Sequence, residues 1–316
     1  MNVFDVFNGD ADGICALVQL RRAEPRPEAR LVTGVKRDIK LLQRVDAKRG
    51  DILTVLDISM RSNQDALLDI LNAGADVFYI DHHNAGTILD HSGLDAVVDT
   101  SPAICTSLIV NTILEGRYRA WAVAAAFGDN FATKAKQLGG GLPLDDLKRL
   151  GELINYNAYG ARLEDLHFHP ADLFKALVPY DTPMEFMAAR PEIVNRLSDG
   201  FKHDLSQAKQ AVILDKTSVG LIVDLGGSVS ARRISGIYSN QLANEHPERA
   251  HAVLTHVTGG FLVSVRAPLA RRRGADRLCL QFKTGGGRPA AAGINLLAKP
   301  DLDRFIKAFR DAFTME

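Results

Sequence analysis

Apolar residues in the first two thirds of the chain form short runs that alternate with longer stretches of helical period. The short runs predict strands at residues 3–7, 31–35, 51–57, 75–80 and 94–98. The longer stretches predict helices at residues 13–22, 36–47, 62–73, 104–114, 118–127 and, with a polar interruption at 155–159, from 144 to about 186. Strands that alternate with helices are typical of a doubly wound, mainly parallel sheet, so we expect an α/β fold here.

The pattern changes after a long amphipathic helix predicted at residues 193–211, which we interpret as a connector. Beyond it, short β-rich runs at 212–214, 219–223, 252–255 and 261–266 are separated by glycines and charged turns. With helices predicted at 235–245 and 302–313, these runs indicate a smaller mixed α/β domain. A chain of 316 residues is long for one core. We therefore predict a first domain at 1–190, a connector helix at 191–211 and a second domain at 212–316.

Polar residues follow three of the predicted strands at the point where each strand ends. The first strand leads into Asn8-Gly9-Asp10-Ala11-Asp12-Gly13, the third ends at Asp57, and the fourth leads into Asp81-His82-His83. Because the carboxyl ends of parallel strands lie at one edge of a sheet, where ligands bind, we expect these side chains to converge. Asp129 follows the helix predicted at 118–127 and is placed to reach the same edge.

Each of these motifs also has a purely structural explanation. Asp10 and Asp12 are typical of a helix N-cap, Asp129 of a C-terminal turn, and two adjacent histidines of a protein surface. Two carboxylates at i and i+2 in a glycine-bounded turn suit oxygen-preferring cations equally well. The residues alone leave both explanations open for each motif.

Composition narrows the function classes. The chain has 38 basic and 38 acidic residues, so no global field draws it onto a long nucleic acid or a membrane surface. Its 46% hydrophobic and 24% charged residues are typical of a soluble globular protein. Cys15, Cys105 and Cys279 lack the spacing of a disulfide framework or a zinc site. With no signal peptide and no membrane-length apolar span, we expect a cytoplasmic protein.

The four polar motifs, in this order along the chain, resemble those of the DHH phosphoesterase family, in which the third motif reads Asp81-His82-His83. The second domain resembles the DHH-associated C-terminal domain through Val263-Ser264-Val265-Arg266 and the glycine-rich segment at 285–293. The resemblance implies two divalent metal ions, usually Mn²⁺, with Asp57 bridging them; the implied ligands are Asp10, Asp12, Asp57, His82 and Asp129. It also implies that Asp81 orients a neighbouring group and that His83 faces the phosphate. Carboxylate and imidazole ligands together suit manganese better than structural zinc, which prefers thiolates. Two adjacent cations suit phosphodiester hydrolysis because they neutralise the charge that develops on the phosphate oxygens.

Two departures from the family pattern concern metal and substrate binding. Val6 stands where many relatives carry a histidine, and Asn8 stands where another branch carries an aspartate. In the second domain, Gly285-Gly286-Gly287 lacks the usual histidine and is followed by Arg288. We predict that the exposed amides of this segment and Arg288, with Arg266 one strand away, grip a terminal phosphate, and we include Asn8 among the substrate-binding residues. A flexible glycine turn is the structural alternative.

The activity that this resemblance implies is a two-metal phosphodiesterase acting on a short linear nucleotide. The favoured substrate is the guanine dinucleotide pGpG, hydrolysed to GMP in cyclic di-GMP turnover. The alternatives are a general nanoRNase or oligoribonuclease, a 3′-phosphoadenosine 5′-phosphate phosphatase, and a nucleotide sensor without turnover. We expect no long nucleic acid and no membrane as partners, and the choice between a monomer and a homodimer is left open.

Overall fold

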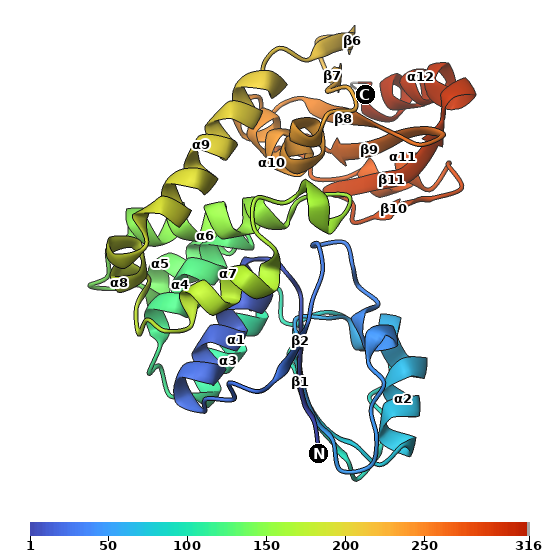
Figure 1. Cartoon of the computed structure of the whole chain (residues 1–316). Helices are drawn as coiled ribbons and strands as arrows, with labels where there is room; N and C mark the ends of the chain where they lie inside the picture. The colour runs from blue at the N-terminus through green and yellow to red at the C-terminus, as the bar shows by residue number, and fades with distance from the viewer. Residues whose placement is uncertain (315–316) are drawn as a thin grey trace. The chain divides into compact units, whose positions relative to one another are not determined.

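The computed structural model describes residues 1–314 (Figure 1). The chain forms two compact units, Met1–Asp199 and Gly200–Glu316. The division between them falls inside the predicted connector, in helix α9 (Pro191–Ala208). No helix among the described residues is long and apolar enough to cross a membrane.

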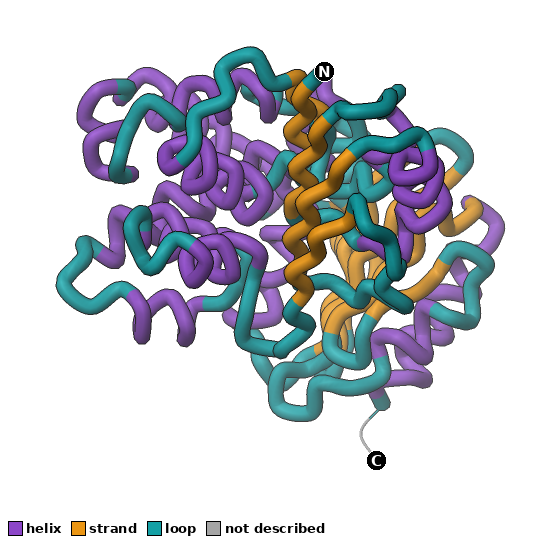
Figure 2. Tube along the Cα trace, turned by 90° about the horizontal axis from the view of Figure 1, so that it is seen from below, coloured by secondary structure: helices purple, strands orange, loops and turns teal. Residues whose placement is uncertain are grey.

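The first unit is built on a five-stranded sheet of order β2-β1-β3-β4-β5, in which every neighbouring pair is parallel. The strands are β1 (Val3–Phe7), β2 (Arg30–Val32), β3 (Ile52–Leu56), β4 (Asp76–Asp81) and β5 (Leu94–Val98). Figure 2 shows helices on both sides of these strands. Because both faces are covered, β1, β3 and β4 are buried along most of their length rather than at alternate residues. The predicted parallel α/β fold is confirmed.

The helices of the first unit include ones near those predicted at 13–22, 62–73, 104–114 and 118–127. They are α1 (Ala11–Ala23), α2 (Gln64–Asn72), α3 (Thr106–Ile113), α4 (Arg119–Gly128), α5 (Ala132–Leu138), α6 (Leu144–Ala158), α7 (Pro170–Leu177) and α8 (Pro183–Ala189). A buried ion pair joins α1 to strand β1, with Arg21 Nε donating to Asp5 Oδ2 at 2.8 Å. The guanidinium also donates to Thr54 Oγ1 at 2.8 Å, so both buried charges are satisfied.

The helix predicted at 36–47 is wrong. Only Leu41–Arg44 forms a short 3₁₀ turn, η1, and the residues before it are irregular. Their backbone groups bond to distant parts of the chain: Lys36 N–H donates to Ala158 O at 3.0 Å, and Ile39 O accepts from Asn63 Nδ2 at 2.6 Å. Long-range hydrogen bonds therefore replace the helical ladder in this segment.

The polar interruption predicted at 155–159 is also wrong for its first residues, because α6 continues to Ala158. The Asn157 side chain is fully buried and pairs with the backbone of Phe168, accepting from its N–H at 3.0 Å and donating to its carbonyl at 2.8 Å. A polar residue on a buried helical face thus joins α6 to the following loop.

The second unit holds a mixed six-stranded sheet of order β10-β11-β9-β8-β7-β6, in which only β7 and β8 pair in parallel among the described strands. The strands are β6 (Val212–Lys216), β7 (Gly220–Asp224), β8 (Ala250–Val257), β9 (Gly260–Arg266), β10 (Gly285–Gly287) and β11 (Ala291–Ala298). The helices are α10 (Val229–Glu245), α11 (Ala275–Cys279) and α12 (Leu302–Phe313). Helix α12 buries Phe305, Phe309 and Phe313, which share one face at i, i+4 and i+8.

Candidate metal centre

Asp10 is the N-cap of α1. Its Oδ1 accepts the backbone N–H groups of Asp12 and Gly13, both at 3.1 Å. The backbone on both sides of Asp10 needs glycine, because a Cβ on Gly9 would clash with the carbonyl oxygen of Gly34, and one on Gly13, in the first turn of α1, would clash with that of Asn8. The cap interpretation is therefore correct for Asp10, and the same geometry holds its other oxygen toward the strand edge.

Asp12 lies in the first turn of α1 and is fully buried. Its two oxygens accept the N–H groups of Thr106 and Ser107, each at 2.7 Å, at the start of α3. Amides at a helix N-terminus stabilise a buried carboxylate in its charged form. The neutral donors leave the charge of Asp12 available to a cation.

Asp57 follows β3 in the left-handed region, with φ +58°. This backbone costs free energy for a residue other than glycine, and such strain gathers at functional sites. Asp57 N–H donates to Ile80 O at 3.1 Å, and Oδ1 accepts from Thr106 Oγ1 at 3.2 Å. Burial, then the nearby charges of Asp12, Asp10, Asp129 and Asp81, raises the pKa of Asp57 well above its usual range.

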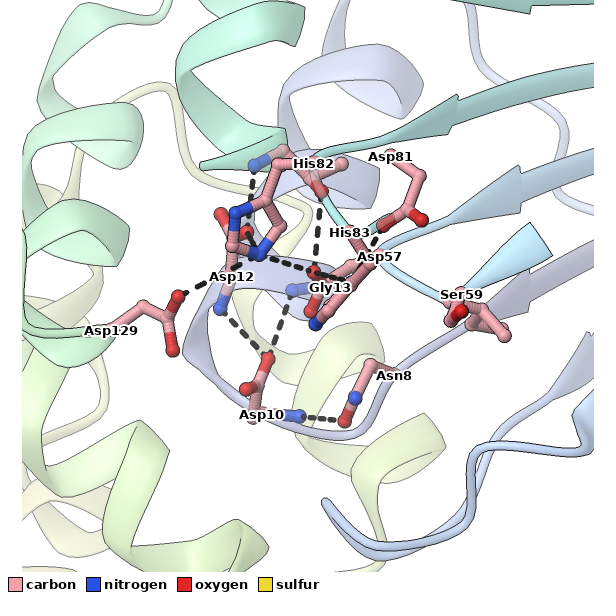
Figure 3. Close-up of polar contacts among 12 residues, drawn as sticks. Asn8, Asp10, Asp12, Gly13, Asp57, Ser59, Asp81, His82, His83 and Asp129 are labelled. Carbon is pink, nitrogen blue, oxygen red and sulfur yellow. Dashed lines mark hydrogen bonds and ion pairs between the residues drawn. The ribbon is translucent and has the colours of Figure 1, made fainter. Parts of the chain in front are cut away.

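His82 directs one ring nitrogen at the carboxylates. Its Nδ1 lies 3.1 Å from the Ile104 carbonyl, which can only accept, so Nε2 is the ring nitrogen that faces the carboxylates. Nε2 lies 3.4 Å from Asp57 Oδ1, 3.8 Å from Asp129 Oδ2 and 3.9 Å from Asp12 Oδ2 (Figure 3). A histidine whose other nitrogen is fixed by a carbonyl has the arrangement of a metal ligand.

His83 and Asp81 form a pair beside this group. His83 Nδ1 lies 2.8 Å from Asp81 Oδ1, and the His83 side chain is 38% exposed. Burial lowers the pKa of His83, but the hydrogen bond and charge of Asp81 outweigh it, and the pKa is raised. Asp81 Oδ2 is buried without a hydrogen-bond partner among the described residues. Asp81 is therefore placed to orient His83.

Asp129 is the C-cap of α4, directly after Gly128. Its Oδ2 faces His82, while Oδ1 accepts from Lys36 Nζ at 3.0 Å. Burial raises the pKa of Asp129 more than the neighbouring Lys36 lowers it. The turn interpretation is thus correct for the backbone, and the side chain still reaches the strand-end group.

Lys36 is the residue at this site that the sequence motifs do not include. Its Nζ donates to Asp10 Oδ2, Asp129 Oδ1 and Asn155 Oδ1. Burial lowers the pKa of Lys36, but the charges of Asp10 and Asp129 raise it well above its usual range. The signal that could have identified Lys36 is its place just after β2, since β2 pairs in parallel with β1 and ends at the same edge.

The donors present fit a divalent ion. Among the described residues, two groups could each hold a metal ion: Asp57–His82–His83 and Asp12–His82–Asp129. Within each group, all ligand atoms lie within 4.8 Å of one another. Carboxylates with imidazole suit Mn²⁺ and related ions. Burial and then the neighbouring carboxylates raise the pKa of Asp57, and a cation bound among these carboxylates would offset their charge. The structure therefore brings Asp12, Asp57, His82 and Asp129 together. Asp10 lies beside them and forms an ion pair with Lys36.

The predicted substrate residues are arranged differently. Asn8 Oδ1 accepts from Asp10 N–H at 3.3 Å, so Asn8 supports the first motif. Gly285, Gly286 and Gly287 form strand β10, opposite Ile294, Gly293 and Ala292 of β11. The predicted row of free amides is wrong at both of its ends: Gly285 N–H donates to Phe282 O, and Arg288 N–H donates to Ala291 O, each at 2.9 Å.

The two arginines lie at the same end of this sheet, where β9 and β10 end, with β11 between these two strands. Arg288 is exposed in the turn after β10. Arg266 ends β9 opposite Ala291, and its guanidinium donates to Asn240 Oδ1 at 2.7 Å and to Ser264 Oγ at 3.0 Å. The amides of Gly285 and Arg288 are thus already hydrogen-bonded, and we expect a phosphate contact here to rest mainly on the arginine side chains.

No family model matches the chain, and no curated protein matches it in sequence. Solved structures match its fold. The DHH domain of a member of a family of ribosomal proteins has a TM-score of 0.68 at 15% identity, over 98% of this chain and 86% of that one. The pGpG-specific phosphodiesterase PggH from Vibrio cholerae has a TM-score of 0.56 at 17% identity, over 98% and 97%. RecJ from Thermus thermophilus in complex with Mn²⁺ has a TM-score of 0.63 at 16% identity, over 98% of this chain but 51% of RecJ. The chain has the fold of the DHH phosphoesterases.

Proposed function

We propose that this chain is a metal-dependent phosphodiesterase that hydrolyses a short linear nucleotide. The observation that carries the proposal is the convergence of Asp12, Asp57 and Asp129 on Nε2 of His82. A divalent ion held by these residues would supply Lewis-acid stabilisation of the phosphate and would lower the pKa of an attacking water. Mn²⁺ is the ion we propose, from the mixture of carboxylate and imidazole donors.

The chain's own residues have separate tasks in this reaction. Asp12, Asp57, His82 and Asp129 hold the ion, and the N–H groups of Thr106 and Ser107 fix Asp12. His83 is held by Asp81 through Nδ1, which leaves Nε2 to donate to a phosphate oxygen. The raised pKa of His83 keeps more of the ring protonated for this contact.

The favoured substrate is pGpG. The neutral net charge supports a short nucleotide over a long strand, because a long polyanion is usually bound by an excess of basic residues. The likeness to a pGpG-specific phosphodiesterase over nearly the full length of both chains supports the same choice. A general nanoRNase and a 3′-phosphoadenosine 5′-phosphate phosphatase are the alternative activities, and a sensor would bind nucleotide without turnover.

The test is a hydrolysis panel with Mn²⁺. It contains pGpG, other 5′-phosphorylated purine and pyrimidine dinucleotides, a long single strand and 3′-phosphoadenosine 5′-phosphate. We expect the highest kcat/KM on pGpG, and Asp57→Asn should abolish turnover while Asp69→Asn, an exposed carboxylate on α2, should not. Equal rates on all dinucleotides would favour a nanoRNase, and tight binding without hydrolysis would favour a sensor.

A further inference from the structure

The Lys36 ammonium lies among side-chain oxygens that could otherwise coordinate a metal ion. Its nitrogen contacts oxygens from three elements: Asp10 before α1, Asp129 after α4, and Asn155 on α6. Asp129 is shared, since its Oδ1 lies 3.0 Å from Lys36 Nζ while Oδ2 lies 3.8 Å from His82 Nε2. One carboxylate thus joins the ammonium to the metal-binding group, as a bridging carboxylate joins two ions.

The backbone holds Lys36 at this place. Its N–H donates to Ala158 O at 3.0 Å, and its carbonyl accepts from Asn8 Nδ2 at 3.5 Å. The ammonium also lies 5.8 Å from the centre of the Tyr159 ring, and the side chain is only 25% exposed. Lys36 is therefore an ordered part of the site rather than a surface lysine that reaches in.

Asp10 differs from Asp12 in what its oxygens contact. Both oxygens of Asp12 accept from neutral amides and remain open to a cation. Asp10 Oδ1 accepts two amides, but Oδ2 already contacts the positive charge of Lys36. Asp10 is absent from both groups of metal-ligand atoms found among the described residues. Val6, on strand β1, is fully buried and offers no further ligand.

We propose that this centre binds one divalent ion per chain, on Asp12, Asp57, His82 and Asp129, and that the Lys36 ammonium replaces a second ion beside Asp10. The inference rests on the metal centre of the proposed function. A dication and an ammonium at the same carboxylate oxygen repel each other, so a second ion would have to displace Lys36. The ammonium gives the site a fixed positive charge for a phosphate oxygen that needs no metal to supply it.

The test counts bound Mn²⁺ rather than activity. The full chain is titrated with Mn²⁺ alone, and free Mn²⁺ is measured by electron paramagnetic resonance. We expect one equivalent for the wild type and two for Lys36→Ala and Lys36→Gln, in which the charge on Asp10 is released. Only these two variants should show the spin-coupled signal of two adjacent ions. Lys40→Ala, at an exposed lysine in the same loop, is the matched control and should bind one.

Two results would overturn the inference alone: two equivalents in the wild type, or one equivalent in both Lys36 variants with circular dichroism showing that they are folded. In either case hydrolysis of dinucleotides would leave the proposed function standing. No bound Mn²⁺ in the wild type would remove the metal centre and both proposals with it. If Lys36→Ala does not fold, Lys36→Gln decides, because its amide can still donate to Asp10 and Asp129.

Discussion

The strand-end site of the first unit and the glycine segment of the second use different parts of the chain to meet a ligand. In the first, backbone amides satisfy Asp10 and Asp12 and so free the charged side chains for a cation. In the second, the backbone of Gly285 to Gly287 pairs with β11, and Arg266 and Arg288 lie at the same end of the sheet. The carboxylates gathered at the first site favour a bound cation, whereas the backbone of β10 is already paired within its sheet. The first site thus offers charged side chains to a ligand, whereas the backbone of the second is used in sheet pairing.

The largest expected effect comes from Asp57→Asn. Asparagine tolerates the left-handed backbone at φ +58° and keeps the side-chain shape, so the fold should persist. Loss of this charge removes Lewis-acid stabilisation worth several kcal/mol, and kcat/KM should fall roughly a thousandfold or more. Steady-state kinetics with Mn²⁺, together with a thermal unfolding curve, makes the measurement. A stable variant with near wild-type turnover would refute the site.

His83→Gln should have the next largest effect. It removes the group that Asp81 holds at 2.8 Å while leaving His82 and the three facing carboxylates in place. We expect kcat to fall by about 10²–10⁴-fold, since this is the usual contribution of a positioned proton donor. Mn²⁺ affinity measured by titration should change little. A large loss of Mn²⁺ binding would show instead that His83 is a ligand.

Arg288→Ala tests whether the second unit reads a terminal phosphate. Arg288 is exposed, so the fold should not depend on it. Loss of a charge-assisted hydrogen bond costs on the order of 1.5–3 kcal/mol, which predicts a roughly ten- to hundredfold rise in KM for a 5′-phosphorylated dinucleotide. KM for the same dinucleotide without the phosphate should not change in this variant. The control Arg277→Ala, at an exposed arginine on α11, should leave KM unchanged for both substrates. Equal losses on both substrates would mean that Arg288 does not contact that phosphate.

The smallest expected effect is a difference in stability between alanine substitutions at two glycines of β10. A Cβ on Gly287 would lie 2.5 Å from Ala292 Cα, and its φ of +140° is strained for other residues, whereas a Cβ on Gly286 meets nothing within 4 Å. Gly287→Ala should lower the free energy of unfolding by about 1–3 kcal/mol, while Gly286→Ala should have a much smaller effect. Urea unfolding of both variants makes the comparison. Equal stability would show that β10 is not paired as described.

The same geometry affects a substitution that the sequence suggests for testing guanine preference. Gly287→His would restore the histidine expected from the family pattern, but its Cβ would meet the same backbone atom of Ala292. A changed base preference in that variant could reflect a displaced strand. Arg288→Ala, compared on purine and pyrimidine dinucleotides, avoids this difficulty.

The sequence by itself determined the residues at the sheet edge. Apolar runs of strand length place Asp57 and Asp81 at strand ends, and alternation with helices makes the strands parallel, so the chemistry of the first site follows from local pattern. The same reasoning gives α12, whose bounds match the predicted 302–313. Hydrophobic period is a local property, and it survives into the fold wherever packing agrees with it.

Tertiary structure decided what local pattern does not encode. Lys36 lies in a segment whose sequence favours a helix, yet hydrogen bonds to Ala158 and carboxylates far along the chain hold it as a loop at the metal centre. Thr106 and Ser107 gain their role only because the start of α3 meets Asp12. The glycines at 285–287 permit a turn or a strand, and pairing with β11 selects the strand. Each outcome depends on partners dozens of residues away or on a neighbouring strand, and no window of sequence contains that information.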